Sequence, residues 1–151
     1  MVEIVDFNPS FKEAFKQLNY EWISKYFEVE ETDREMLEDP EGHIIDKGGA
    51  ILIALMEEEP IGTCALIKME GSKYELAKMA VSPKAQRQKI GLRLGEATIK
   101  KARELKADAL FLETNSVLKP AINLYKKLGF AEITGTESPY NRCNVQMELK
   151  L

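Results

Sequence analysis

The fold is decided by the stretch Glu75-Leu76-Ala77-Lys78-Met79-Ala80-Val81-Ser82-Pro83, which continues after two residues as Gln86-Arg87-Gln88-Lys89-Ile90-Gly91. Its first half is typical of a β-strand, and the residues that follow, up to Leu105, carry apolar side chains on one helical face. A strand that leads directly into a helix directs free backbone amides toward whatever lies at the helix start, and the helix dipole favours an anion there. The loop adds basic side chains at this position. The sequence therefore predicts an anion site suited to phosphates, although many strand–helix connections of this kind bind no ligand.

Around this unit, strand-like runs recur along the whole chain. They cover residues 2–6, 50–56, 61–69, 74–81, 109–113, 130–134 and 143–151. Short polar breaks separate the second run from the third and the third from the fourth, which predicts antiparallel hairpins. The chain has 151 residues and shows no repeat or linker, so residues 1–151 are expected to form a single domain with a mixed sheet.

The helix boundaries carry recognisable start and stop signals. The first helix has two candidate starts, Asn8 before a proline or the capping box Ser10-x-x-Glu13. A second capping box, Thr32-x-x-Glu35, is expected to open a shorter helix that ends at Asp39-Pro40. The last helix is expected to stop at Gly129, because glycine readily adopts the left-handed conformation of a helix C-cap.

The composition excludes several classes of protein. Hydrophobic residues make up 44% and charged residues 30% of the chain, which is ordinary globular composition. A net charge of −4 argues against a nucleic-acid partner. No apolar run is long enough to span a membrane. The first seven residues contain acidic side chains and no basic ones, whereas a signal peptide begins with a basic region, so we expect a cytoplasmic protein.

The residues that commonly bind metals are few and badly spaced. The single histidine, His43, cannot complete a catalytic triad or a zinc site with the residues around it. The two cysteines, Cys64 and Cys143, lie in apolar, strand-like stretches without metal-ligand spacing. We expect no metal and interpret the cysteines as buried free thiols rather than as a redox pair.

Two blocks of the sequence resemble the signatures of the GNAT superfamily of N-acyltransferases. The first is the strand ending Val81-Ser82-Pro83 with the loop Gln86 to Gly91, which is similar to the family's cofactor motif. The second, Ala121-Ile122-Asn123-Leu124-Tyr125 followed by Lys-Leu-Gly-Phe, is similar to the family's last helix and its end. Each block alone is only suggestive, but they occur in the family's order and spacing, and the expected elements match across nearly the whole chain.

The resemblance implies a mixed α/β (α+β) fold and the place of its cofactor. A central, mostly antiparallel sheet of about seven strands would be flanked by four helices, and two parallel strands ending near Val81 and Glu113 would splay apart. Coenzyme A, or acetyl-CoA as co-substrate, would lie in that wedge. The cofactor-binding residues would be the strand residues Met79, Ala80 and Val81 and the loop residues Gln86, Arg87, Gln88, Lys89, Ile90, Gly91 and Leu92.

The same resemblance implies two catalytic roles. Tyr125 matches the family tyrosine that acts as general acid toward the cofactor sulfur, and its alternative is a core aromatic residue. Glu75 matches the position of a general base used by some family members, acting directly or through water, and its alternative is a solvated carboxylate at a strand edge. Simple strand alternation would put Glu75, Ala77, Met79 and Val81 on one face.

Three positions depart from the family's pattern, and one of them is Arg87, where the family often has a glycine. Lys89 stands where the family has a motif glycine, and we expect it to be tolerated, because a residue at a helix start should have right-handed dihedral angles. Leu118 stands where many relatives have an asparagine that contacts the cofactor. Asn115, three residues earlier, is the expected substitute.

The acceptor is the least determined part of the prediction. Glu28, Glu30, Glu31 and Asp33 lie between the first two expected helices, a region that borders the acceptor groove in relatives. These carboxylates are expected either to attract a cationic amine or to form a solvated acidic loop. Tyr26, Phe27 and Tyr140 are expected to form an apolar wall of the same groove.

The sequence therefore predicts an acetyl-CoA-dependent N-acetyltransferase that acts by direct attack of a primary amine in a ternary complex. The acceptor would be a small molecule or a peptide, and the protein a monomer or homodimer. The alternative is a non-catalytic coenzyme A-binding sensor or interaction protein with the same fold, which the departures at Lys89 and Leu118 favour and the presence of Glu75 and Tyr125 disfavours.

Overall fold

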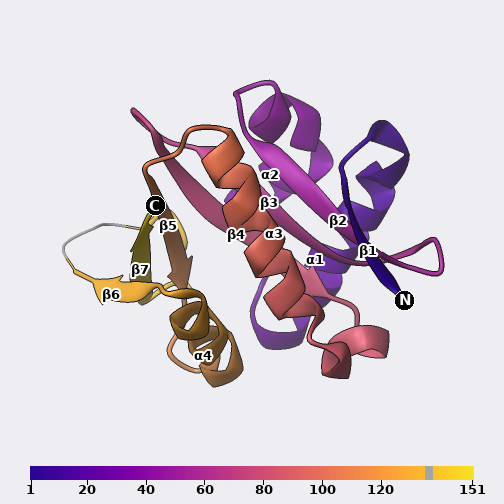
Figure 1. The fold of residues 1–151 in the computed structure, drawn as a ribbon. Helices are drawn as coiled ribbons and strands as arrows, with labels where there is room; N and C mark the ends of the chain where they lie inside the picture. Colours follow the sequence, from indigo (N-terminus) through magenta and orange to yellow (C-terminus); the bar gives the residue numbers. More distant parts are fainter. Residues whose placement is uncertain (135–137) are drawn as a thin grey trace.

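A seven-stranded sheet between two layers of helices forms the body of the protein (Figure 1). The computed structural model describes residues 1–134 and 138–151, and for residues 86–88 it describes only the course of the backbone. The strands are β1 (Val2–Asp6), β2 (Ala50–Met56), β3 (Glu59–Lys68), β4 (Lys73–Val81), β5 (Ala109–Thr114), β6 (Ala131–Ile133) and β7 (Val145–Lys150). The α-helices are α1 (Lys12–Tyr26), α2 (Glu31–Glu38), α3 (Ile90–Glu104) and α4 (Lys119–Leu128). The expected mixed α/β fold is confirmed.

The strand order β1-β2-β3-β4-β5-β7-β6 places the parallel pair in the middle of the sheet. The parallel ladder between β4 and β5 pairs Lys73 with Ala109 and ends at Glu75 with Phe111, while β5 goes on pairing with β7 up to Thr114. The other strand pairs that the structure describes are antiparallel. The second halves of β4 and β5 therefore diverge, as expected, and leave a wedge between them.

A β-bulge in β4 divides this strand into two parts that face opposite sides. The β3–β4 register shifts between Thr63 and Ala65, and opposite this shift Lys78 has a φ of 53°, in the left-handed region. An extra residue changes the phase of the side-chain alternation. The expectation that four alternate residues share one face is therefore wrong. Glu75 and Ala77 face α1, whereas Met79 and Val81 face α3.

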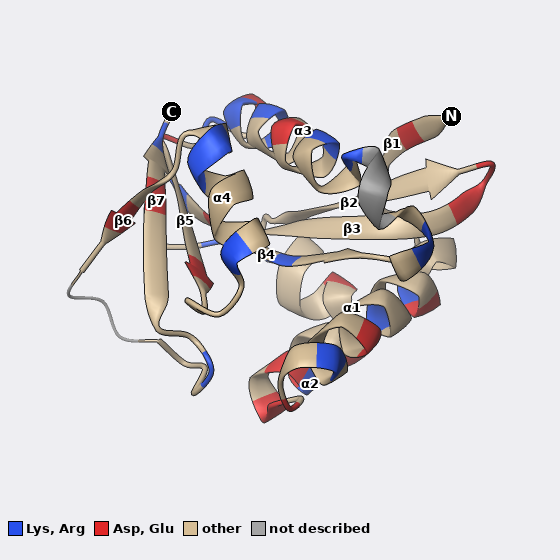
Figure 2. Cartoon of the chain, turned by 90° about the horizontal axis from the view of Figure 1, so that it is seen from below, with Lys and Arg blue, Asp and Glu red and all other residues tan. Residues whose placement is uncertain are grey.

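Each face of the sheet is covered by its own pair of helices (Figure 2). On one face α1 and α2 contribute Phe15, Ile23 and Leu37, all buried, and on the other α3 contributes Ile90 and Leu94. These side chains recur at helical spacing, which is why the amphipathic pattern predicted both helices. In the part of the chain that the structure describes, no helix is long and apolar enough to cross a bilayer.

Close packing between α3 and α4 depends on a glycine. A Cβ built on Gly95 would lie 2.5 Å from Cδ1 of Leu128, a distance that side chains essentially never show. Gly129 ends α4 with a φ of 106°, which confirms the expected left-handed cap. These glycines set the position of α4, and with it the position of Tyr125, relative to the sheet.

The starts of the first two helices differ in detail from the capping boxes expected. The side chain of Asn8 accepts a hydrogen bond from the amide of Ser10 at 2.9 Å and caps a short 3₁₀ turn, Pro9–Phe11, that precedes α1. The expected box from Ser10 to Glu13 is not the cap that forms. At α2 the box consists of Glu30 and Asp33 instead of Thr32 and Glu35, because the helix begins one residue before Thr32.

Candidate active site

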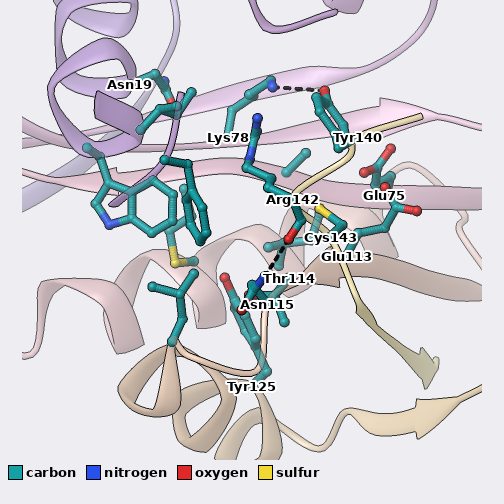
Figure 3. Close-up of a pocket in the computed structure, with 17 residues that line it drawn as sticks. Asn19, Glu75, Lys78, Glu113, Thr114, Asn115, Tyr125, Tyr140, Arg142 and Cys143 are labelled. Atoms are coloured by element: carbon teal, nitrogen blue, oxygen red, sulfur yellow. Dashed lines mark hydrogen bonds between the residues drawn. The ribbon is translucent and has the colours of Figure 1, made fainter. Parts of the chain in front are cut away.

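Two cavities meet at the wedge between β4 and β5. The outer cavity, of about 420 Å³, lies between the end of β4, the start of α3 and the face of α4. The inner cavity, of about 80 Å³, lies on the α1 side of the sheet and is shown in Figure 3. Trp22, Met79, Leu118 and Tyr125 line both cavities. The two cavities therefore lie side by side, at the gap that the diverging strands leave.

Four of the residues predicted to bind the cofactor line the outer cavity. Met79, Ala80, Val81 and Gly91 line it, together with Tyr26, which was predicted for the acceptor side. Ile90 is instead buried in the core under α3, and Leu92 is half-buried outside the lining. The side chains of Gln86, Arg87 and Gln88 lie outside the described residues.

Lys89 adopts a backbone conformation that the sequence analysis did not expect. It is the N-cap of α3 with φ 57° and ψ 29°, so its dihedral angles are left-handed. The expectation of right-handed angles is wrong, because Lys89 is not part of the helix but the single residue that links a 3₁₀ turn (Pro83–Gln88) to α3. Glycine adopts this conformation without the steric cost that a Cβ brings, which explains the glycine in the family's pattern.

Tyr125 lies at the junction of the two cavities. Its ring packs edge-on against Phe130 at 6.1 Å between centroids, which fixes the ring at the end of α4. Burial raises the pKa of its hydroxyl well above the usual value, so the group is protonated at neutral pH. Tyr125 packs against the core and also lines both cavities, and its role as general acid stays a prediction.

Two carboxylates, from Glu75 on β4 and Glu113 on β5, lie together in the inner cavity (Figure 3). Burial and, to a lesser extent, the negative charge of Glu113 raise the pKa of Glu75 to about 7. The nearby charge of Lys78 lowers this pKa, but by less than Glu113 raises it. The carboxylate oxygens of Glu113 accept hydrogen bonds from Ser138 Oγ at 3.0 Å and from Gln146 Nε2 at 3.1 Å. A carboxylate that gains and loses its proton near pH 7 is suited to proton transfer.

Glu113 is a site residue that sequence reasoning missed. In the parallel ladder Glu75 is paired with Phe111, so Glu113, two residues further along β5, lies on the same face as Glu75. The signal in the sequence was an acidic residue at the end of a strand expected to run parallel to the strand of Glu75. The register that brings the two together cannot be inferred from either strand alone.

The acidic residues expected to attract the acceptor form an internal ion-pair network instead. Asp33 is fully buried; its Oδ1 and Oδ2 accept hydrogen bonds from both Arg142 guanidinium nitrogens at 2.8 and 2.7 Å, and Oδ1 also accepts one from Lys78 Nζ at 2.7 Å. Burial alone would raise the pKa of Asp33, but these cations lower it to about 2. Glu30 caps α2 and pairs with Arg142 at 3.3 Å. Neither carboxylate is available to attract an amine.

The other two members of that acidic group lie away from the cavities. Glu31 is exposed and forms a surface ion pair with Arg34 at 3.5 Å. Glu28 is exposed and, like Glu30, does not belong to the lining of the cavities described above. The prediction that this group captures a cationic acceptor is therefore wrong, because its buried members are neutralised by Lys78 and Arg142.

Phe27 and Tyr140, predicted for the acceptor wall, do line the inner cavity. The hydroxyl of Tyr140 accepts a hydrogen bond from Lys78 Nζ at 2.9 Å, and the guanidinium of Arg142 lies 4.5 Å from the centre of its ring. Burial raises the pKa of Tyr140, so its hydroxyl is protonated at neutral pH. This wall therefore presents two aromatic rings and, at the Tyr140 hydroxyl, one polar group.

The β5–α4 turn is held by Asn115. Its side-chain amide donates to the carbonyl of Arg142 at 2.6 Å, and its Oδ1 accepts from the amide of Val117 at 2.9 Å. Asn115 lines the inner cavity, whereas Leu118 lines both. The structure thus gives Asn115 a role in shaping the turn, and the cofactor contact expected of it stays a prediction.

The two thiols differ in position. Cys64 is buried in the core, and burial raises its pKa to about 12, as expected for a structural free thiol. Cys143 is half-buried and lines the inner cavity, where burial and the charge of Glu113 raise its pKa to about 11. Both thiols are neutral at physiological pH and hence poor nucleophiles.

Comparisons with known proteins agree with this architecture. An acetyltransferase of the GNAT family from Staphylococcus aureus Mu50 superposes with a TM-score of 0.89 over 99% of both chains at 23% identity. An acetyltransferase from Bacillus subtilis, solved in complex with CoA, superposes with a TM-score of 0.77 over 100% of this chain and 99% of that chain at 19% identity.

A curated relative and a family model extend these likenesses to the sequence. An IAA acetyltransferase from Azospirillum brasilense is 38% identical over 90 residues, which is 59% of this chain and 58% of that protein's length. The model of the acetyltransferase (GNAT) family matches residues 16–130, from within α1 to just past α4, and so includes every residue that lines the outer cavity. The chain belongs to the GNAT family of acetyltransferases.

Proposed function

We propose that the protein transfers the acetyl group of acetyl-CoA to a primary amine by direct attack in a ternary complex. The observation that carries this proposal is that Tyr125 lines both cavities, so that two substrates, one in each cavity, would both lie next to it. Holding two reactants in contact replaces a second-order encounter with a step inside the complex.

The outer cavity is the candidate site for coenzyme A. A volume of about 420 Å³ lies within the range usual for small-ligand sites. The backbone of Met79 and Ala80 borders it beyond the end of the β4–β5 ladder, where an extended ligand arm could add to the sheet. The amides at the start of α3, from Lys89 to Leu92, would hold the pyrophosphate. When bound, acetyl-CoA supplies the activated acetyl group.

On the acceptor side, Glu75 would take a proton from the ammonium of the amine, directly or through a water. Its pKa of about 7 leaves it partly ionised at neutral pH, which is the condition a general base requires. The carboxyl group of Glu113 would lie beside it and help to hold the ammonium. As the new C–N bond forms and the C–S bond breaks, Tyr125 would give its proton to the departing sulfur.

The test begins with binding and then follows turnover. Saturating acetyl-CoA should stabilise the fold by about 2.7 kcal/mol at a hundredfold excess over Kd, whereas NAD and ATP should not. Thiol release from acetyl-CoA should then depend on an added primary amine. Replacing Tyr125 by Phe keeps the ring that packs on Phe130 and should lower turnover by about 10²–10⁴.

Each outcome separates the proposals. A melting curve that acetyl-CoA leaves unmoved rules out both an enzyme and a coenzyme A sensor. Binding without turnover for any of a broad set of primary amines selects the non-catalytic sensor. An unchanged rate for Tyr125→Phe with a good acceptor would leave Tyr125 a packing residue only.

A further inference from the structure

We propose that the acceptor is a small primary amine with a compact apolar body, and that the Asp33–Arg142 ion pair closes the inner cavity to a polypeptide N-terminus. This inference rests on the proposed function and names the substrate class of that site. It depends on the size of the inner cavity, on the charges that remain uncompensated in it and on the contacts that close its wall.

The inner cavity accommodates only a short molecule. Its volume is about 80 Å³, which is small beside the roughly 300–1,000 Å³ of pockets that take drug-sized ligands. The apolar side of the cavity is formed by Trp22 and Ile23 of α1 and by Phe27, which directly follows α1. The charged side is formed by Glu75 and Glu113. An amine that fits has its ammonium at the carboxylates and a few carbon atoms against the aromatic residues.

The charge left in the cavity is negative because its two cations are already paired. Lys78 and Arg142 also line the cavity, but both are bound to Asp33, at 2.7 to 2.8 Å, with side chains only 4% and 14% exposed. The carboxylates of Glu75 and Glu113 have no such cationic partner among the ion pairs of the described residues. A cationic ligand compensates them, whereas a carboxylate or phosphate ligand would be repelled.

The wall on the side of residues 140–143 is joined to α2 and to the bulge of β4. Arg142 forms two hydrogen bonds with Asp33 and one with Glu30, and the amide of Asn141 donates to Glu30 at 3.1 Å. Neighbouring strands of a sheet lie about 4.8 Å apart, whereas the paired atoms of this wall are held at 2.7 to 3.3 Å, so no extended chain passes between them. Opening it would leave buried ions unpaired.

The experiment compares acceptors that share one ammonium group and differ in length. With the native chain, kcat/KM is measured at saturating acetyl-CoA for short alkyl- and arylalkylamines and for a pentapeptide with a free N-terminus. We expect the best short amine to exceed the peptide at least a hundredfold. Arg142→Ala, which removes the joining side chain, should narrow that ratio at least tenfold while the KM for acetyl-CoA stays within twofold.

Two further variants keep the result interpretable. Arg34→Ala breaks an exposed ion pair on α2, the helix that carries Asp33. It should leave the ratio of kcat/KM between the short amine and the peptide unchanged. If Arg142→Ala does not fold, Tyr140→Ala removes the ring over which Arg142 lies but keeps both partners of the Asp33–Arg142 pair, and it should also narrow the ratio.

A peptide used as well as the best short amine by the native chain overturns the inference and leaves the acetyltransferase proposal standing. An unchanged ratio in folded Arg142→Ala and Tyr140→Ala overturns the closing role of this wall. Turnover with neither class of acceptor removes the proposed function, and this inference with it.

Discussion

The most direct test of the site is the pH dependence that Glu75 should impose on turnover. With a pKa of about 7, Glu75 is half ionised at pH 7, about one-tenth ionised at pH 6 and about one-hundredth at pH 5. If the carboxylate is the base, kcat/KM should fall about tenfold per pH unit below pH 7. Glu75→Gln, which keeps the shape and removes the base, should lower kcat/KM at pH 8 by about 10²–10⁴ and abolish this limb.

The assay is thiol release at saturating acetyl-CoA between pH 5 and 8, with an amine that stays protonated over the whole range. The matched control is Glu113→Gln. The charge of Glu113 raises the pKa of Glu75, so its removal should move the acid limb to lower pH while a limb is still present. A limb that belonged to the amine would not move in this variant.

Folding stability provides a second readout that does not depend on turnover. The pKa of Glu75 lies above its ordinary value of 4.5 in the folded protein, so the folded state binds this proton more tightly than the unfolded state. Glu75 therefore costs the native chain stability progressively as the pH rises from about 4.5 to about 7. Over the same window the advantage of Glu75→Gln in unfolding free energy should grow toward the order of 3 kcal/mol.

The reasoning is refuted if the native profile is flat from pH 5 to 8, or if Glu75→Gln keeps both the acid limb and the rate. It is also refuted if the stability difference between Glu75→Gln and the native chain does not change with pH. A rate that survives in Glu75→Gln and disappears in Glu113→Gln would transfer the role of base to Glu113.

Two further predictions concern stability, and both are measured by urea unfolding. Asp33→Asn should lower the unfolding free energy by about 3–5 kcal/mol at pH 7, because it weakens the buried pairing of Lys78 and Arg142. The control Glu59→Gln, in an exposed ion pair, should lower it by no more than about 1 kcal/mol. A loss below about 1 kcal/mol for Asp33→Asn would contradict the stabilising role of the buried ion pairs. Since the folded pKa of Asp33 is about 2 and its ordinary value 3.8, its contribution should be present above pH 4 and disappear as the pH falls toward 2. Lys89→Gly should exceed Lys89→Ala in unfolding free energy by about 0.5–1 kcal/mol, because Lys89 has a φ of 57°, and a glycine variant no more stable than the alanine variant would argue against the left-handed conformation.

The features that could be predicted from the sequence are those that depend on residues close together in the chain. The amphipathic spacing of α3, the left-handed stop at Gly129 and the hairpins of β2, β3 and β4 all arise from local patterns. Tyr125 could be placed for the same reason, because its helix and the cap behind it form one continuous motif. The helix starts at α1 and α2 were less certain, since several polar residues competed for each cap.

The features that the sequence could not predict depend on contacts between distant residues. Arg142 reaches Asp33 across 109 positions of the chain, and nothing near either residue indicates the other. The bulge at Lys78 is visible only as a shift of register against β3, and it moves Met79 to the opposite face from Glu75. Local reasoning therefore expected an amine as the partner of Asp33, whereas Asp33 pairs with Lys78 and Arg142.

The sequence by itself determined the order of the elements, because that order depends on local patterns. It also indicated the family and the two residues proposed for proton transfer, because these follow from the order and spacing of the family's motifs. Only the tertiary structure decided which carboxylates remain for a ligand. The cations of Lys78 and Arg142 compensate the charge of buried Asp33. Burial, together with the charge of Glu113 that the parallel register of β4 and β5 brings close, raises the pKa of Glu75 to about 7. The charge of a buried group depends on its neighbours in space, and those neighbours come from parts of the chain that only folding brings together.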